Sequence, residues 1–103
     1  MCGISGIFTV KKTSTFNNKA ELDLINSAMD NRGPDATGVW GNNHSKIIFG
    51  HKRLSIIDIN SRSDQPMESN TKRFVITYNG EIYNFKELRN HLEDKQCSFS
   101  TNG

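Results

Sequence analysis

The sequence has few of the features that mark membrane, secreted or nucleic-acid-binding proteins. Its most apolar stretch, CGISGIFTV, is far too short to cross a bilayer and lacks the charged lead and apolar length of a signal peptide. Only two cysteines are present, Cys2 and Cys97, and without a secretory signal we expect both to be reduced. The 13 basic and 11 acidic residues are spread along the chain, and the net charge is only +2. These scarcities predict a cytoplasmic protein with no membrane contact and no nucleic-acid partner.

Metal-binding motifs are also lacking. The three histidines fall at no ligand-like spacing with either cysteine, so the sequence predicts no metal site. With 103 residues, 34% of them hydrophobic, the chain is long enough for one domain with a modest core. It contains no repeat, low-complexity tract or linker, so we expect a single unit.

The apolar pattern of the first half predicts a β-rich α/β unit. Loose alternation over residues 3–10 indicates a buried strand, and its glycines suit close approach by other backbone. Residues 20–30 place apolar side chains at helical spacing, and Pro34 ends that helix in a loop. Two short apolar runs within residues 39–54, joined by the turn sequence GNN, are typical of a β-hairpin.

The second half continues the same mixture. Residues 55–72 are rich in turn formers and predict a structured loop. Residues 73–80, RFVITYNG, predict a strand closed by Asn-Gly, and residues 84–95 predict an amphipathic helix with Asn84 as a natural N-cap. The final segment, CSFSTNG, predicts the beginning of another strand.

Cys2 has an unusual position, directly behind the initiator methionine. Removal of that methionine would leave Cys2 with a free α-amino group beside its thiol. An amine with a pKa of ~8 can take the thiol proton directly or through a water, so one residue would supply both nucleophile and base. The alternative is that Cys2 is a small, half-buried apolar residue near a terminus. Its position alone leaves both interpretations open.

Four segments occur along the chain in this order: MCGISGIF, NRGPDATGVW, GHKRLSIIDIN with DQPM behind it, and YNGEIYNFKELR. Together they resemble the class II glutamine amidotransferase domain of asparagine synthetases, a branch of the N-terminal nucleophile hydrolases. The resemblance runs through nearly the whole chain. It implies an α+β fold of the N-terminal nucleophile hydrolase type, a four-layer αββα sandwich, here truncated, and it implies glutamine as the substrate.

The resemblance also implies catalytic roles. Cys2 would attack the side-chain amide carbon of glutamine, form a γ-glutamyl thioester and release ammonia. The side-chain amide of Asn79 and the backbone N–H of Gly80 would stabilise the oxyanion, and both groups are suitable donors. An Asn-Gly pair is also a common hairpin turn, so an ordinary turn is the alternative for these two residues.

Further residues would bind the substrate, again by resemblance. Arg53 would hold the α-carboxylate, because its planar fork of donors gives bidentate geometry. Glu81 would accept from the α-ammonium group, and the alternative is a surface Glu near a helix start. Contacts along the substrate, with a plain core role as the alternative, would come from Leu54, Ile56 and Ile57.

Other residues of these segments are expected to have structural roles. Lys52 should be solvated, and Arg32 and Asp35 could pair to hold the loop that borders the pocket. Cys97 should be a packed strand residue without a partner that would make it reactive. The aromatic residues expected to fill the core between sheet and helices are Trp40, Phe49, Tyr78, Tyr83 and Phe85.

The pattern departs from the family in two ways. A further acidic residue that helps to grip the α-ammonium group would follow the last segment, where this chain ends. The synthetase domain of the family, which would use ATP and Mg²⁺, is absent, whereas the amidotransferase domain needs no cofactor. We therefore expect residues 1–103 to be a partial type 2 glutamine amidotransferase domain from the N-terminal part of a longer enzyme. Its partners would be glutamine and the missing synthetase domain.

Three hypotheses about function stay open at this point. The first is a glutaminase-type amidotransferase that uses Cys2. The second is a catalytically incompetent fragment that keeps a glutamine pocket. The third is the amidotransferase part of an enzyme that amidates another acceptor, because acceptor choice resides in the absent domain. An exposed sheet face or edge would also favour self-association, so a homo-oligomer is a further expectation.

Overall fold

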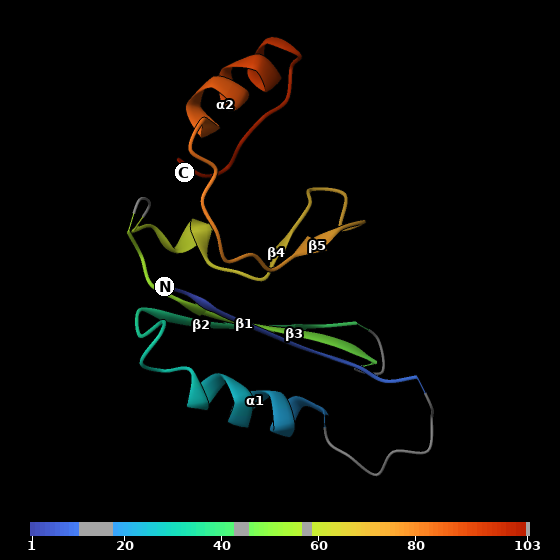
Figure 1. The fold of residues 1–103 in the computed structure, drawn as a ribbon. Helices are drawn as coiled ribbons and strands as arrows, with labels where there is room; N and C mark the ends of the chain where they lie inside the picture. Colours follow the sequence, from blue (N-terminus) through green and yellow to red (C-terminus); the bar gives the residue numbers. More distant parts are fainter. Residues whose placement is uncertain (11–17, 43–45, 57–58, 103) are drawn as a thin grey trace.

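The computed structural model describes residues 1–10, 18–42, 46–56 and 59–102 as a layered mixture of helices and strands (Figure 1). In chain order the elements are β1 (Gly3–Phe8), α1 (Asn18–Ala28), β2 (Ala36–Gly41), β3 (Ile47–Arg53), the 3-10 turn η2 (Ser61–Ser63), β4 (Met67–Glu68), β5 (Val75–Ile76) and α2 (Phe85–Asp94). The expected mixture of α and β structure is confirmed. Neither helix in this part of the chain is long and apolar enough to cross a membrane.

Three antiparallel strands form the main sheet, with β3 in the centre between β1 and β2. Gly3 lies opposite Lys52 at one end of the β1–β3 pair, and Phe8 lies opposite Ile47 at the other. On the other edge of β3, Ala36 begins β2 opposite Arg53. The predicted hairpin is therefore confirmed, although it starts earlier than the apolar pattern indicated.

Helix α1 covers one face of this sheet (Figure 1). Leu22 of α1 is 0% exposed and Ile48 of β3 is 2% exposed, and these two side chains form the buried apolar core of the described residues. Beside them, the Ser5 hydroxyl donates to Asn26 Oδ1 at 2.9 Å. A Cβ at Gly50 would overlap both of those polar side chains, so glycine lets α1 come close to β3.

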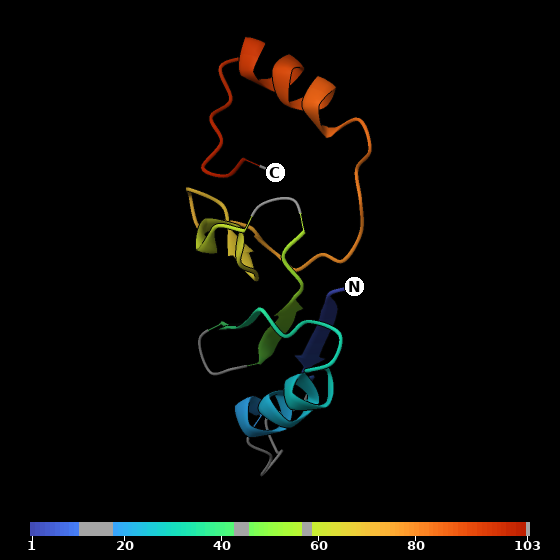
Figure 2. The same cartoon turned by 90° about the vertical axis from the view of Figure 1, so that its left-hand side faces the viewer.

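The opposite face of the sheet is covered only in part, by the segment that contains β4 and β5 (Figure 2). A Cβ at Gly38 of β2 would collide with the backbone carbonyl of Gln65, so that loop lies directly on the strand. The side-chain Oε1 of Gln65 accepts from the Tyr78 N–H at 2.6 Å, and the Thr77 hydroxyl donates to the Gly50 carbonyl at 3.4 Å. The loop and the segment after β5 are thereby tied to each other and to β3.

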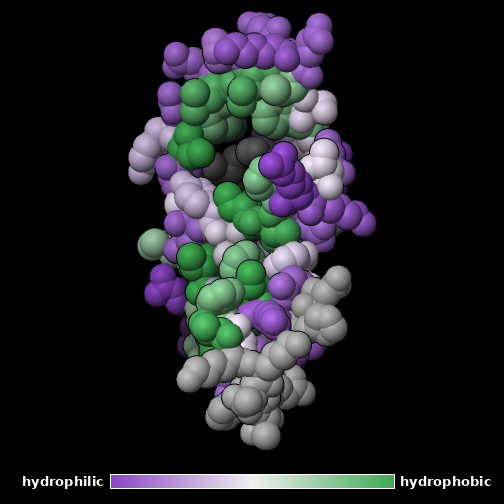
Figure 3. Space-filling model, turned by 90° about the vertical axis from the view of Figure 1, so that its right-hand side faces the viewer, coloured by the Kyte–Doolittle hydropathy of each residue, from purple (hydrophilic) through white to green (hydrophobic). Residues whose placement is uncertain are grey.

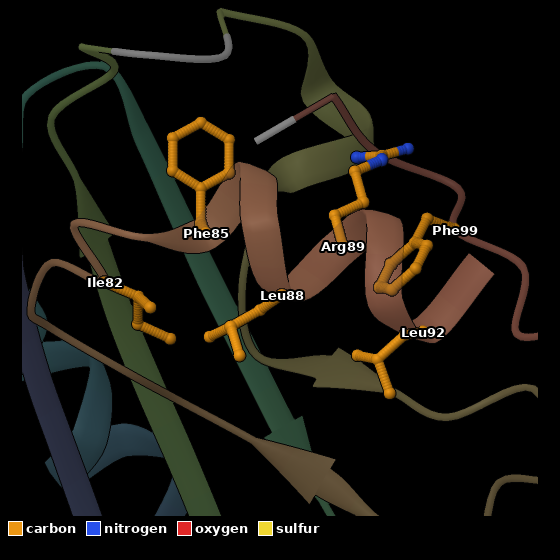
Figure 4. Close-up of a pocket in the computed structure, with 6 residues that line it drawn as sticks. All are labelled: Ile82, Phe85, Leu88, Arg89, Leu92 and Phe99. Atoms are coloured by element: carbon orange, nitrogen blue, oxygen red, sulfur yellow. The ribbon is translucent and has the colours of Figure 1, made fainter. Parts of the chain in front are cut away.

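Helix α2 and the segments on both sides of it line an apolar hollow of about 200 Å³. Figure 3 shows the apolar surface gathered around it, and Figure 4 shows the lining side chains, Ile82, Phe85, Leu88, Arg89, Leu92 and Phe99. The Arg89 guanidinium lies 4.8 Å from the centre of the Phe99 ring and donates to the Thr101 carbonyl at 2.7 Å. These contacts fold the end of the chain back onto α2.

Several expectations about individual elements are wrong. The final segment does not form a strand, because its Phe99 turns back to Arg89, and Cys97 is exposed. The strand expected over residues 73–80 pairs at Val75–Ile76 alone. Asn84 occupies the N-cap position of α2, but its side chain makes no capping hydrogen bond.

Burial also differs from expectation at the surface of the sheet and near α2. Tyr83 is 94% exposed and does not fill a core, whereas the rings of Trp40 and Phe49 do pack together, with centroids 5.8 Å apart. The first strand is half-exposed, with Ile4 at 49% and Phe8 at 68%, because α1 covers only its other face.

The packing of α1 predicts a large difference between two leucines of the same helix. Replacing Leu22 with Ala should lower the free energy of unfolding by about 2–5 kcal/mol, because it leaves a cavity against the sheet. Leu24→Ala is the matched control, since Leu24 is 74% exposed, and it should change stability by less than about 0.5 kcal/mol. Urea denaturation followed by circular dichroism measures both. Equal effects of the two substitutions would contradict the packing of α1.

Candidate active site

The Cys2 thiol lies at the end of the sheet, just before β1 begins. Its Sγ accepts from the Leu54 N–H at 3.3 Å and lies 3.6 Å from the Leu54 carbonyl, to which the thiol donates. The side chain is half-buried, and the cysteine is not in a disulfide. Two backbone groups of one residue thus hold the thiol in place.

Arg53, the last residue of β3, directly precedes this contact. Its side chain is only 9% exposed, and Nη1 donates to Asp64 Oδ1 at 2.6 Å and to the Asn60 carbonyl at 2.9 Å. Asp64 is the C-cap residue of η2. The structure therefore brings the predicted nucleophile, Cys2, and the predicted carboxylate-binding residue to the same end of the sheet.

Lys52 is buried, so the expectation that it is solvated is wrong. Its Nζ forms an ion pair with Asp30 at 2.6 Å and donates to the Thr37 hydroxyl at 2.5 Å. Side chains alternate along a strand, so Lys52 and Arg53 point to opposite faces of the sheet. Lys52 points to the α1 face, where Asp30, just after that helix, balances its charge.

The loop in the segment RGPD is held by a contact other than the expected one. The Asp35 carboxylate accepts from the Ser55 N–H at 2.6 Å, and the described residues contain no ion pair between Arg32 and Asp35. A Cβ at Gly33 would collide with the Lys52 carbonyl, so the loop lies tightly against β3. The loop is therefore fastened to the end of β3 that contacts the thiol.

Asn79 and Gly80 follow a segment that runs along β3. The Tyr78 carbonyl accepts from His51 Nε2 at 3.2 Å. One residue earlier on each segment, the Thr77 hydroxyl contacts the Gly50 carbonyl. The two segments therefore advance in the same direction, toward Arg53. Figures 1 and 2 both show the chain between β5 and α2 passing close to the N-terminus. Asn79 is half-buried and Gly80 is exposed.

His51 lies beside this site, although the sequence pattern indicated nothing for it beyond the lack of metal-ligand spacing. Its side chain is 1% exposed, and burial lowers the pKa of the imidazole below its ordinary value of 6.5. The Tyr78 carbonyl opposes this shift, the charge of Arg53 adds to it, and the charge of Asp64 opposes it. At neutral pH this direction favours the uncharged imidazole, and because a carbonyl can only accept, we assign the proton to Nε2. Its position two residues before Arg53 on a strand, hence on the same face, is the signal that could have found it.

The remaining predicted substrate contacts lie around this end of the sheet or beyond it. Leu54 is half-buried and contacts the thiol through its backbone, whereas Ile56 is 69% exposed. Glu81 is exposed, and Ile57 lies outside the described residues. The substrate-binding roles of all four stay predictions. In the part of the chain that the structure describes, no three His, Cys, Asp or Glu side chains are grouped so that they could hold a metal ion.

Comparison with known proteins identifies similar sequences of much greater length. The family described as "Glutamine amidotransferase domain" matches residues 1–103. Asparagine synthetase [glutamine-hydrolyzing] 3 of Bacillus subtilis is 40% identical over 101 residues, which are 96% of this chain and 16% of that protein. Asparagine synthetase B [glutamine-hydrolyzing] of Escherichia coli is 38% identical over 95 residues, 92% of this chain and 16% of that protein.

A plant relative gives the same result. Asparagine synthetase [glutamine-hydrolyzing] of Asparagus officinalis is 39% identical over 94 residues, 91% of this chain and 15% of that protein. The chain thus spans 15–16% of the length of these relatives. No solved structure matches the chain.

The burial of neutral His51 predicts a pH dependence of stability. Because its pKa is lower in the folded than in the unfolded chain, its contribution is complete above the unfolded pKa of 6.5 and is lost as pH falls toward the folded pKa. Between about pH 7.5 and about pH 5.5, the free energy of unfolding should fall more in the wild type than in His51→Gln, which keeps an N–H donor for Tyr78. Urea titrations measure both.

His91→Gln provides the matched control for that experiment, because His91 is an exposed histidine on α2. It should keep the wild-type pH dependence. The same fall of stability in wild type and His51→Gln would contradict the assignment of a buried, neutral His51.

Proposed function

The chain belongs to the glutamine amidotransferase domain family, and from that premise we propose that it hydrolyses glutamine as the amidotransferase part of a glutamine-hydrolysing asparagine synthetase. The observation that carries the proposal is the 3.3 Å contact between Cys2 Sγ and the Leu54 N–H. This contact supports it because the thiol then lies beside the residue that follows Arg53, a buried cation suited to a substrate carboxylate.

Cys2 acts as the nucleophile once Met1 has been removed. The freed α-amine takes the thiol proton, and Sγ forms a bond to the side-chain amide carbon of glutamine. The C–N bond then breaks, and ammonia leaves with the proton that the amine returns. Water hydrolyses the γ-glutamyl thioester to glutamate and restores the thiol.

Asn79 and Gly80 supply the oxyanion hole. The side-chain amide of Asn79 and the backbone N–H of Gly80 donate to the oxygen that becomes negative in the tetrahedral intermediate. Such donors are effective only when they are fixed before the reaction, and the bond from His51 to the Tyr78 carbonyl fixes the residue just before them. A buried imidazole thereby serves the oxyanion hole without touching the substrate.

The charged ends of glutamine are bound by groups of opposite charge. Arg53 binds the α-carboxylate, and Glu81 accepts from the α-ammonium group. Contacts along the carbon chain of the substrate come from Leu54, Ile56 and Ile57. With both ends held, the amide carbon comes within reach of the thiol, which raises the rate by proximity.

The wider setting of the domain is part of the proposal. The order of α1, main sheet, β4–β5 hairpin and α2 in Figure 1 supports the αββα sandwich of the N-terminal nucleophile hydrolases. The names of the similar proteins support an asparagine synthetase as the parent enzyme. In such an enzyme an ATP- and Mg²⁺-dependent synthetase domain, in the cytoplasm, is the partner that consumes the ammonia.

The role of Cys2 predicts loss of glutamine hydrolysis in Cys2→Ala. Release of ammonia and glutamate should fall to the background of the assay, because no thioester can form. The glutamine analogue 6-diazo-5-oxo-norleucine should add once to the wild type, at Cys2, as measured by mass spectrometry of peptides. Cys97→Ala is the matched control and should keep both activity and labelling, since Cys97 is exposed and distant in sequence. Activity that survives Cys2→Ala would rule out the mechanism.

The oxyanion role predicts a selective loss in Asn79→Ala. Removal of one such donor should lower kcat by about 100- to 1000-fold, with a much smaller change in KM. Asn90→Ala, which changes an exposed asparagine on α2, should leave both constants unchanged. Steady-state kinetics with glutamine distinguish the two variants. An Asn79→Ala enzyme with wild-type kcat would show that the Asn-Gly pair is an ordinary turn.

A further inference from the structure

Asp64 already accepts a hydrogen bond from the Arg53 guanidinium, the group that is proposed to bind the substrate. Its Oδ1 lies 2.6 Å from Nη1 of Arg53, and the same nitrogen donates to the Asn60 carbonyl at 2.9 Å. A terminal guanidinium nitrogen carries two hydrogens, so these two acceptors use both hydrogens of Nη1. A carboxylate that approaches Arg53 from the Nη1 side must therefore displace one of them.

Asp64 is the acceptor that can leave at lower cost. Its side chain is 39% exposed, so its carboxylate regains water when the pair breaks. The competing acceptor is a backbone carbonyl, that of Asn60 at the N-cap of η2. The side chain of Asn60 also accepts from the Arg62 N–H at 2.9 Å. Its carbonyl therefore cannot move without moving the turn.

Charge makes Asp64 a competitor of the substrate carboxylate whichever side of the guanidinium the substrate approaches. Asp64 balances the single positive charge of Arg53, so a substrate carboxylate would bring a second negative charge to one cation. The Arg53 side chain is 9% exposed, and water screens charges less in such a buried place. Asp64 and an incoming carboxylate therefore repel each other across Arg53.

We propose that Asp64 competes with the substrate for Arg53 and thereby sets the affinity of the chain for the α-carboxylate of glutamine. The inference rests on the proposed function, because it takes Arg53 as the carboxylate-binding residue. Asp64 then acts through Arg53, as a competitor of the substrate carboxylate, and takes no part in bond breaking. Its removal should alter KM and leave kcat unchanged.

The test is a binding measurement on the chain as purified from cells, in which Cys2→Ala prevents turnover. In that background, Asp64→Asn should lower the Kd of L-glutamine about three- to tenfold, because the competing charge is gone. L-glutaminamide, in which a neutral amide replaces the α-carboxylate, should bind both proteins equally. Calorimetry gives both constants. In the enzyme with Cys2 intact, Asp64→Asn should lower KM by the same factor.

Two further variants complete the test. Asp64→Ser removes the charge with a different side chain, so it replaces Asp64→Asn if that protein does not fold. Asp23→Asn removes an equal charge from the exposed Lys19–Asp23 pair of α1 and should leave every constant unchanged.

The possible results separate this inference from the proposed function. If the Cys2→Ala chain binds no glutamine, the proposed function and the inference both fail. If it binds glutamine with the same Kd in the presence and absence of the Asp64 charge, the inference alone is overturned. Weaker binding of glutamine to Asp64→Asn also overturns it, because Asp64 would then hold Arg53 in place for the substrate. An equal change for glutamine and L-glutaminamide would indicate a structural effect and overturn it as well.

Discussion

The antiparallel pairing of β1 with β3 is the contact on which the rest of the structure depends. Cys2 and Leu54 are 52 residues apart in sequence, and this pairing brings them together. Small residues fix its register, because a Cβ at Gly3 would collide with Met29 and a Cβ at Gly50 would collide with the polar groups under α1. A slip by one residue would turn every side chain of β1 to the other face of the sheet.

Strand β3 ends in three consecutive buried polar residues, and their burial links the sheet to its surroundings. Burying a charge is costly unless it is paired, so Lys52 and Arg53 each need an acidic partner from another part of the chain. Asp30 after α1 supplies one, and Asp64 after η2 supplies the other. Neutral His51 needs none and instead donates to the segment after β5. The end of β3 is thus connected to both layers that cover the sheet.

Sequence periodicity predicts the parts of this fold in which the apolar pattern is local, such as the β2–β3 hairpin and both helices. It does not predict the burial of Lys52, because lysines are solvated by default and its partner lies on another element. The pairing of Arg53 with Asp64 connects a strand to a loop and leaves no period in the sequence. The apolar residues around Phe99 were misread as a strand because alternation cannot show that an arginine of α2 lies across the ring. The resemblance pointed to Cys2 and Arg53, which the fold brings together. It did not point to the buried imidazole of His51 on β3.

The order in which the chain is made gives the β1–β3 pairing a further consequence. Ribosomes synthesise the N-terminus first, so β1 emerges long before the strand with which it pairs. Until residue 54 has left the ribosome, the end of the chain at Met1 and the thiol beside it have no partner in the sheet. An aminopeptidase that works on nascent chains therefore meets an open terminus, and the folded chain still leaves Met1 74% exposed.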